Sequence, residues 1–192
     1  GHRLMMDRVV PGGVTQDLDA AGTARLRELI GDVRRHFPEL VDLYDNTASL
    51  QDRTVTTGIL KPDLAKPFGA SGFVGRASGR KCDARRWPGY APYTDLAFET
   101  PVRAEGDVDA RVWIRIDEVT QSLGIIEQCL EALPRGVVSS PVPVRAAGSK
   151  GAEGLALVES FRGDILAWVS LREGGIVDHC HLRDPSCFQW PL

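Results

Sequence analysis

Residues 107–133, with the sequence DVDARVWIRIDEVTQSLGIIEQCLEAL, carry the strongest periodic pattern in the chain. Apolar side chains recur at every third or fourth position, which is the spacing of one face of an α-helix. Asp107 or Asp109 can cap the first turn, and a Pro-Arg-Gly sequence directly after the segment ends the helix. This stretch predicts a long helix against which other elements pack.

A second helical region precedes it, over about residues 17–57. Apolar residues from Leu26 to Tyr44 again recur at intervals of three and four, with Asp17 or Asp19 as the cap. Pro38 lies inside this pattern and should kink or split the helix, because proline lacks the backbone N–H that a helix needs. The helices predicted before residue 68 are 17–44, 47–57 with Gly58 as its C-terminal cap, and 62–67.

The pattern changes to strands near the end of the chain. Apolar runs alternate there with turn residues, Ser160-Phe161-Arg162-Gly163 first and Gly174-Gly175 second. This order predicts a three-stranded antiparallel sheet over about 154–182. Helices followed by a small sheet place the chain in the α+β class. The predicted strands are 155–159, 164–171 and 176–182.

Composition and charge exclude several classes of protein. The chain has 192 residues, 43% of them hydrophobic and 26% charged, and a net charge of −3, which is typical of a soluble globular domain and not of a disordered chain. No apolar run is long enough to cross a membrane, and the charge gives no case for nucleic-acid binding. Gly1 and Leu192 do not resemble natural termini, so we expect residues 1–192 to be a single-domain piece of a longer protein.

The segment Gly69–Gly79 is the first candidate site. It contains four glycines, which let a backbone approach a ligand closely, and it lies in a long stretch, 68–106, that shows no periodic pattern. Connecting segments of this length inside a compact domain more often have a function than not. The segment lacks the lysine of a P-loop. It is therefore either a loop that contacts a ligand or an irregular packed loop.

Arg162 is the second candidate, at the tip of the predicted hairpin. A tight turn between two strands is rigid, so a guanidinium there either points into a functional site in a fixed position or is solvated. Five basic residues form another cluster, which either binds an acidic partner or a neighbouring subunit or is a solvated loop. They are Arg76, Arg80, Lys81, Arg85 and Arg86.

Histidines and cysteines give a weaker signal. His179 and His181 share one face of a strand and could join Cys187 in a metal site, although no full ligand set is visible and structural histidines are the alternative. The cysteines form no CxxC pair, which excludes a zinc knuckle or a complete iron–sulfur ligand set, and we expect reduced thiols. They are Cys82, Cys129, Cys180 and Cys187.

Several short motifs occur together in one order along nearly the whole chain. In that order they resemble the quinone-site subunit of respiratory complex I, the NADH–quinone oxidoreductase, and the homologous large subunit of membrane-bound nickel–iron hydrogenases. The resemblance implies a fragment of a hydrogenase-large-subunit-like fold. The motifs are Pro11-Gly12-Gly13-Val14, Gln51-Asp52-Arg53-Thr54-Val55, Gly69–Gly79 with Asp83 and Arg85, 121–130, Glu159-Ser160-Phe161-Arg162-Gly163 and Arg183-Asp184-Pro185-Ser186.

Within this superfamily, Arg162 and the motif around Asp184 are more similar to the hydrogenase branch that includes formate hydrogenlyase and hydrogenase-4. The resemblance implies that Arg162 matches the arginine that overhangs the nickel–iron site, with Phe161 where proline is common. Asp184 becomes a further catalytic candidate. The resemblance also implies that the Gly69–Gly79 segment lines the cavity, with Gly69, Ser71, Gly72, Arg76 and Gly79 as candidate cofactor-binding residues.

The same resemblance implies the parent protein and its partners. The two CxxC pairs that hold nickel and iron in hydrogenases are absent from this sequence, so the fragment alone is expected to bind no metal and to be inactive, while a nickel–iron centre is possible in the parent. The expected parent is the catalytic subunit of an energy-converting hydrogenase, cytoplasmic and peripheral to the inner membrane, with an iron–sulfur electron-transfer subunit and membrane proton-pumping subunits as partners.

Two alternatives stay open. The protein can be a subunit of the complex I type, which lines a quinone site without a metal of its own. The complex would then also bind NAD. It can also be a non-catalytic assembly or coupling module.

Overall fold

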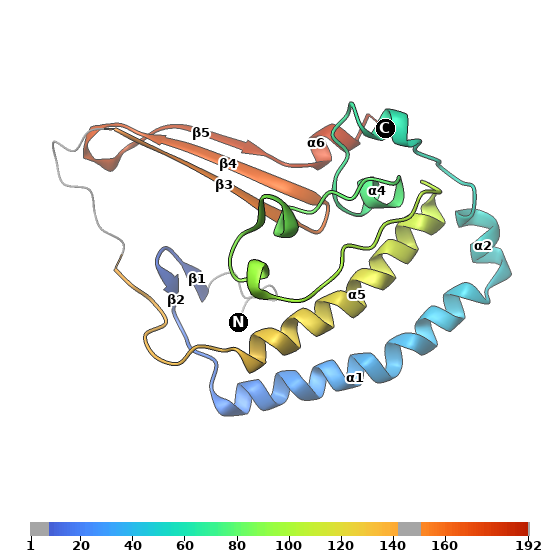
Figure 1. Ribbon diagram of the computed structural model, residues 1–192, viewed down its shortest axis with the longest axis horizontal. Helices are drawn as coiled ribbons and strands as arrows, with labels where there is room; N and C mark the ends of the chain where they lie inside the picture. The colour runs from blue at the N-terminus through green and yellow to red at the C-terminus, as the bar shows by residue number, and fades with distance from the viewer. Residues whose placement is uncertain (1–7, 142–150, 192) are drawn as a thin grey trace.

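The computed structural model describes residues 8–141 and 151–191. Two long helices, α1 (Ala20–Asp45) and α5 (Val108–Glu131), lie side by side (Figure 1). Each begins at an aspartate whose carboxylate accepts a backbone N–H, Asp19 at 2.6 Å and Asp107 at 2.8 Å. Both predicted long helices are confirmed, and the structure uses Asp19 and Asp107 as their caps.

Contacts along their length join the two helices. The Tyr44 hydroxyl donates a hydrogen bond to Asp109 at 2.7 Å, and the Tyr44 ring meets Trp113 edge-on at a centroid distance of 6.4 Å. Farther along, Arg34 of α1 forms an ion pair with Glu127 of α5. Because the end of α1 meets the start of α5, the two helices are antiparallel.

Pro38 does not split α1, which continues through it to Asp45. A proline removes only one N–H from the helix. The contacts of Arg34 and Tyr44 with α5 lie on either side of Pro38. Of the two outcomes predicted at this residue, a kink or a split, the split is wrong.

Two shorter helices follow, α2 (Ala48–Thr54) and α3 (Pro62–Ala65). The structure ends α2 before Gly58, where the sequence placed the C-terminal cap. The backbone turns instead at Thr56, whose φ is 58° and whose N–H donates to the Asp107 carboxylate at 2.7 Å. The end of α2 is therefore set by the capping residue of α5, which local sequence does not reveal.

Residues 68–106 contain a helix that the sequence did not predict, α4 (Gly72–Ala77), and the short turns η2 (Arg85–Gly89) and η3 (Tyr93–Asp95). Ala77 of α4 is buried with Ala110 and Ile114 of α5, and Phe73 packs against them. The expectation of an irregular loop over Gly69–Gly79 is therefore wrong at its centre. Six helical residues are too few to show a period.

The predicted three-stranded sheet is confirmed. Its antiparallel order is β3-β4-β5, and Leu157 pairs with Leu166 and Ala167 with Leu182. A two-stranded hairpin near the start, β1 (Val9–Val10) with β2 (Gly13–Val14), is separate from it. The elements of this last part of the chain are β3 (Ala152–Ser160), β4 (Gly163–Leu171), η4 (Glu173–Gly175), β5 (Val177–Arg183) and α6 (Ser186–Gln189).

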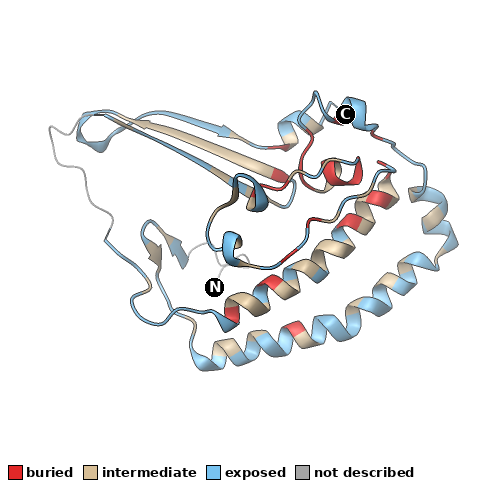
Figure 2. Cartoon of the chain, viewed as in Figure 1, coloured by how far each residue is buried: buried red, intermediate tan, exposed pale blue. Residues whose placement is uncertain are grey.

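Burial is concentrated on α4, α5 and the segments beside them, while α1 and the outer strands β3 and β5 are largely exposed and β4 is mostly intermediate (Figure 2). The protein exposes 13043 Å², whereas a compact monomer of this mass exposes about 9,000 Å². Leu40, Leu155 and Leu182 lie on this surface with exposed fractions of 61%, 68% and 68%. Much of the exposed apolar area is of the kind that neighbouring protein covers.

None of the helices within the described residues has the length and hydropathy needed to span a bilayer.

Candidate functional site

The tip of the β3–β4 hairpin packs directly on the N-terminal end of α4. Gly72 has a φ of +59°, and a Cβ atom there would lie 2.3 Å from the carbonyl carbon of Arg162. A Cβ atom on Gly163 would lie 2.1 Å from Ser71 Oγ. Because no side chain fits at either position, the two glycines allow α4 and the hairpin to meet backbone to backbone.

Hydrogen bonds fix this junction. Gln189 of α6 donates through Nε2 to the carbonyls of Ser71 and Arg162, each at 3.0 Å. Ser160 Oγ donates to the Gly163 carbonyl at 2.7 Å and tightens the turn. The backbone of Arg162 is thus held by α4 and by α6, while its side chain is exposed.

Asp184 lies near Arg162 in space, although 22 positions separate them. Hydrogen bonds from Ser186 lower the pKa of the Asp184 carboxyl, and the positive charge of Arg162 adds to this effect. Asp184 is exposed. The structure therefore brings the two catalytic candidates into one neighbourhood at the surface.

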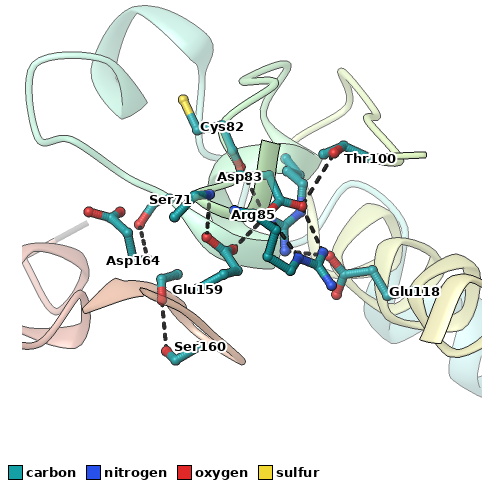
Figure 3. A network of polar contacts seen from close by, with 12 residues as sticks. Ser71, Cys82, Asp83, Arg85, Thr100, Glu118, Glu159, Ser160 and Asp164 are labelled. Carbon is teal, nitrogen blue, oxygen red and sulfur yellow. Dashed lines mark hydrogen bonds and ion pairs between the residues drawn. The ribbon is translucent and has the colours of Figure 1, made fainter. Parts of the chain in front are cut away.

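Behind the hairpin tip, a buried ion network joins α4, α5 and β3. The side chain of Arg76 on α4 is 2% exposed and contacts the carboxylates of Glu118 on α5 and Glu159 on β3, the latter at 2.8 Å. Glu159 also accepts the backbone N–H of Ala84 at 2.9 Å. Figure 3 shows Glu118 and Glu159 reaching the same region from α5 and from the hairpin. Since Glu159 lies three residues before Arg162, this network anchors the hairpin.

Burial raises the pKa of the Glu159 carboxyl above its ordinary value, although the hydrogen bonds from Arg76 and Ala84 oppose the change. Asp83 behaves in the opposite way. Burial would raise its pKa, but two hydrogen bonds from the Arg85 guanidinium, at 2.9 and 2.7 Å, and the charge of Arg85 lower it. Asp83 is therefore ionised and paired.

The predicted basic cluster is divided by the fold. Arg76 and Arg85 are taken up in buried ion pairs, whereas Lys81 and Arg86 are exposed. Arg86 lies over the ring of Phe98 at 4.1 Å. The cluster is thus neither one solvated loop nor one continuous basic surface.

A cavity of about 590 Å³ lies beside the network, within the size range of small-molecule sites. Phe161, next to Arg162, lines it and stacks on Phe73 at a centroid distance of 5.4 Å. Arg115 of α5 lies over the Phe161 ring at 4.7 Å. The lining combines apolar with charged side chains; the apolar ones include Phe37, Val112, Ile116, Val119 and Leu123, and the charged ones include Arg76, Arg85, Glu118 and Glu159.

The residues predicted to bind a cofactor do not all reach this cavity. Arg76 lines it, while Ser71 and Gly72 contact the hairpin. Gly69 and Gly79 are turn positions with φ of +62° and +81°. Arg162 and Asp184 lie outside the residues that line the cavity. A role of these residues in cofactor binding or catalysis stays a prediction.

Sequence reasoning missed the two glutamates that meet Arg76. Glu118 lies in the strongest helical pattern and Glu159 at the end of a strand. Glu159 was named only as part of the hairpin motif, and charged residues at such positions are usually solvated, so a contact of either glutamate with Arg76 was not predicted.

Comparison with known proteins decides the family. Residues 1–150 match the family model described as respiratory-chain NADH dehydrogenase, 49 kDa subunit. The chain belongs to this family. The predicted membership of the superfamily of complex I and hydrogenase subunits is thereby confirmed.

Relatives of this family member come from both sides of the superfamily. It is 35% identical to an NADH-quinone oxidoreductase subunit of Syntrophobacter fumaroxidans, over 97% of this chain and 50% of that protein. It is 32% identical to the carbon monoxide-induced hydrogenase of Rhodospirillum rubrum, over 99% of this chain and 52% of that protein. The chain thus spans about half the length of these relatives.

A solved structure supports the fold. One chain of the membrane-bound sulfane sulfur reductase, an archaeal respiratory membrane complex, superposes with a TM-score of 0.84 at 29% sequence identity. The match covers 93% of this chain and 50% of that one. The mixed α+β architecture is therefore shared with a subunit of a respiratory complex.

The residues present do not fit the ligand set of a nickel–iron centre. Within residues 8–141 and 151–191, no group of three or more His, Cys, Asp or Glu side chains is placed to hold a metal ion. His179 and His181 share one face of β5 as predicted, and both are exposed. Cys187 does not complete a site with them.

Proposed function

We propose that this chain is part of the catalytic large subunit of a membrane-associated, energy-converting oxidoreductase of the hydrogenase type. The observation that carries the proposal is the mounting of Arg162. Its backbone is clamped between α4 and α6 while its guanidinium stays exposed beside Asp184. A cation that extends from a fixed backbone position can stabilise charge that develops in a reaction, and a preorganised mount lowers the cost of placing it there.

The fragment supplies the arginine in this proposal, and any metal ligands come from elsewhere in the parent. Arg162 would present its guanidinium to the reacting centre. Gln189 and Gly72 keep the Arg162 backbone in place, the first by a hydrogen bond and the second by close backbone contact. Similarity to a hydrogenase at 32% identity supports this assignment.

Quinone reduction is the second candidate. The apolar wall of the cavity on α5 is of a kind that accepts a flat hydrophobic ring. The similarity to an NADH-quinone oxidoreductase subunit, at 35% identity, is of the same order as that to the hydrogenase. In this case the cavity, and not Arg162, would hold the substrate.

We further propose that the parent works beside an iron–sulfur electron-transfer subunit and membrane proton-pumping subunits, peripheral to a membrane. The similarity to one chain of a membrane-bound respiratory complex supports this placement. The excess exposed apolar surface supports neighbours of some kind.

The test uses the full-length protein in its native complex. Its nickel and iron content, hydrogen evolution and quinone reduction would be measured for the wild type and for Arg162→Ala. Loss of one well-placed donor costs about 10² to 10³ in turnover, so we expect a hydrogenase-type activity to fall by about that factor. Arg172→Ala is the matched control, because Arg172 is an exposed arginine at the opposite end of β4.

Unchanged turnover in Arg162→Ala would contradict the assigned role. Intact protein that lacks nickel and reduces quinone would replace the hydrogenase proposal with the quinone one. Intact protein without either activity would leave an assembly or coupling module.

A further inference from the structure

The turn η2 carries one of the most exposed large apolar side chains in the part of the chain that the structure describes. Trp87 is 84% exposed. A tryptophan that is covered by a neighbour buries about 150–250 Å², and here most of this surface faces water. Trp87 belongs neither to the lining of the cavity nor to the ion network behind Arg162. The candidate site therefore gives this side chain no role.

The Trp87 backbone is held in place although its side chain is exposed. The Asp83 carbonyl accepts the Trp87 N–H at 3.0 Å, and the Gly89 N–H donates to the Ala84 carbonyl at 3.1 Å. Ala84 is itself tied to the buried carboxylate of Glu159. A backbone fixed on both sides lowers the entropy cost of covering the side chain that it carries. Trp87 is thus preorganised to enter a pocket on another surface.

Arg86 places a positive charge beside this side chain. It is exposed, and its guanidinium lies over the Phe98 ring at 4.1 Å. The neighbouring Arg85 is paired with Asp83, whereas Arg86 has no acidic partner within residues 8–141 and 151–191. A surface that covers Trp87 therefore meets an uncompensated cation, which a carboxylate at the edge of its pocket would complement.

An aromatic anchor beside a free arginine is typical of the contact between two subunits. Tryptophan and arginine are enriched in such interfaces and account for many of their hot spots. A segment of the same polypeptide that packed over Trp87 would extend the protein core to Arg86, and charged side chains are rarely buried in a core without a partner. A solved relative is one chain of a respiratory membrane complex, which favours another subunit as the occupant.

We propose that Trp87 anchors the parent protein to another subunit of its complex, which offers an apolar pocket with a carboxylate at its rim. Trp87 fills the pocket, and Arg86 pairs with the carboxylate. The inference rests on the proposed placement of the parent in a multi-subunit complex, but not on the role of Arg162 or on the reaction. It gives a function to an exposed member of the basic cluster that the fold divides.

Reassociation of the purified full-length parent with the remaining subunits of its complex tests the proposal. Loss of a hot-spot tryptophan should raise the dissociation constant at least about 30-fold in Trp87→Ala. The melting temperature of the free parent should stay unchanged, because this side chain packs little in the folded protein. Arg86→Gln should slow association, and more so at low salt, since charges at a rim act mainly on the encounter rate. Arg35→Gln, at an exposed arginine of α1, is the matched control and should change neither quantity.

Photocrosslinking in the intact complex identifies the occupant. Benzoylphenylalanine in place of Trp87 should form its crosslink with another subunit. A crosslink to a second copy of this chain, to another part of the same polypeptide or to lipid would overturn the proposal, and so would the absence of a crosslink or an unchanged dissociation constant in Trp87→Ala. A parent that purifies without partner subunits would contradict the proposed placement in a complex, and this inference with it.

Discussion

Replacing Gly72 by alanine tests the junction between α4 and the Arg162 hairpin. Gly72 and Gly69 have nearly the same backbone conformation, with φ of +59° and +62°. They differ in their surroundings. A Cβ atom on Gly72 would lie 2.3 Å from the Arg162 backbone, whereas a Cβ atom on Gly69 would have no neighbour within 4 Å.

This difference sets the expected magnitudes. Alanine in the left-handed region costs about 1–2 kcal/mol, and both variants share this cost. They also share the small gain from a stiffer unfolded chain. Gly72→Ala must in addition displace backbone, and overpacking of this kind costs about 1–3 kcal/mol. We therefore expect Gly72→Ala to be the less stable variant by about 1–3 kcal/mol.

The assay is urea unfolding followed by circular dichroism, with hydrogen exchange at the amides of the hairpin. Exchange at Gly163 and Asp164 should accelerate in Gly72→Ala and stay unchanged in Gly69→Ala. Equal unfolding free energies for the two variants would refute the backbone-to-backbone contact.

Three further predictions concern the supports of the site. Asp107→Ala should lower the unfolding free energy by about 1–2 kcal/mol, because the carboxylate accepts N–H groups from both Ala110 and Thr56; urea unfolding would show no loss if this cap were unimportant. Ile114→Ala removes a side chain that is 0% exposed and should cost about 2–5 kcal/mol, against which a near-neutral result in the same assay would count. Since the pKa of Asp83 is lowered in the folded state, it adds stability above its unfolded pKa of about 4 that is lost as pH falls through the folded value. Melting temperatures measured from neutral to acid pH should fall less steeply in Asp83→Asn than in the wild type, and equal slopes would contradict this pairing.

The sequence predicted those elements whose signals are local. The long helix over 107–133 and the hairpin around Arg162 were recognised from period and turn residues. The face of α5 was predicted less well. Leu130 of the predicted apolar stripe is buried, as are Ile114 and Ile125 outside it. Other members of the stripe line the cavity instead, namely Val112, Ile116, Val119 and Leu123. A helix that is contacted on several sides does not reveal its buried face by period alone.

The ion network could not be predicted because its members are distant in sequence. Arg76 and Glu159 are 83 positions apart, and nothing in either neighbourhood points to the other. The end of α2 at Thr54 has the same cause, since it depends on Asp107. The glycine residues predicted part of this arrangement. The glycines of Gly69–Gly79 indicated a close backbone approach, and the structure identifies the hairpin as the neighbour of Gly72.

The sheet has the shape of a lever arm attached at its hairpin end (Figure 1). The contacts at Glu159, Phe161 and Gly163 that join the sheet to α4 and α5 all lie at its hairpin end, and the other end extends away from the helices (Figure 1). Nine residues of β4 span about 30 Å at the rise of an extended strand. A rotation that displaces the far end by several ångströms leaves the clamped end almost still. Arg162 lies at the attached end, so we expect a displacement of the distant turn at η4 to move Arg162 little.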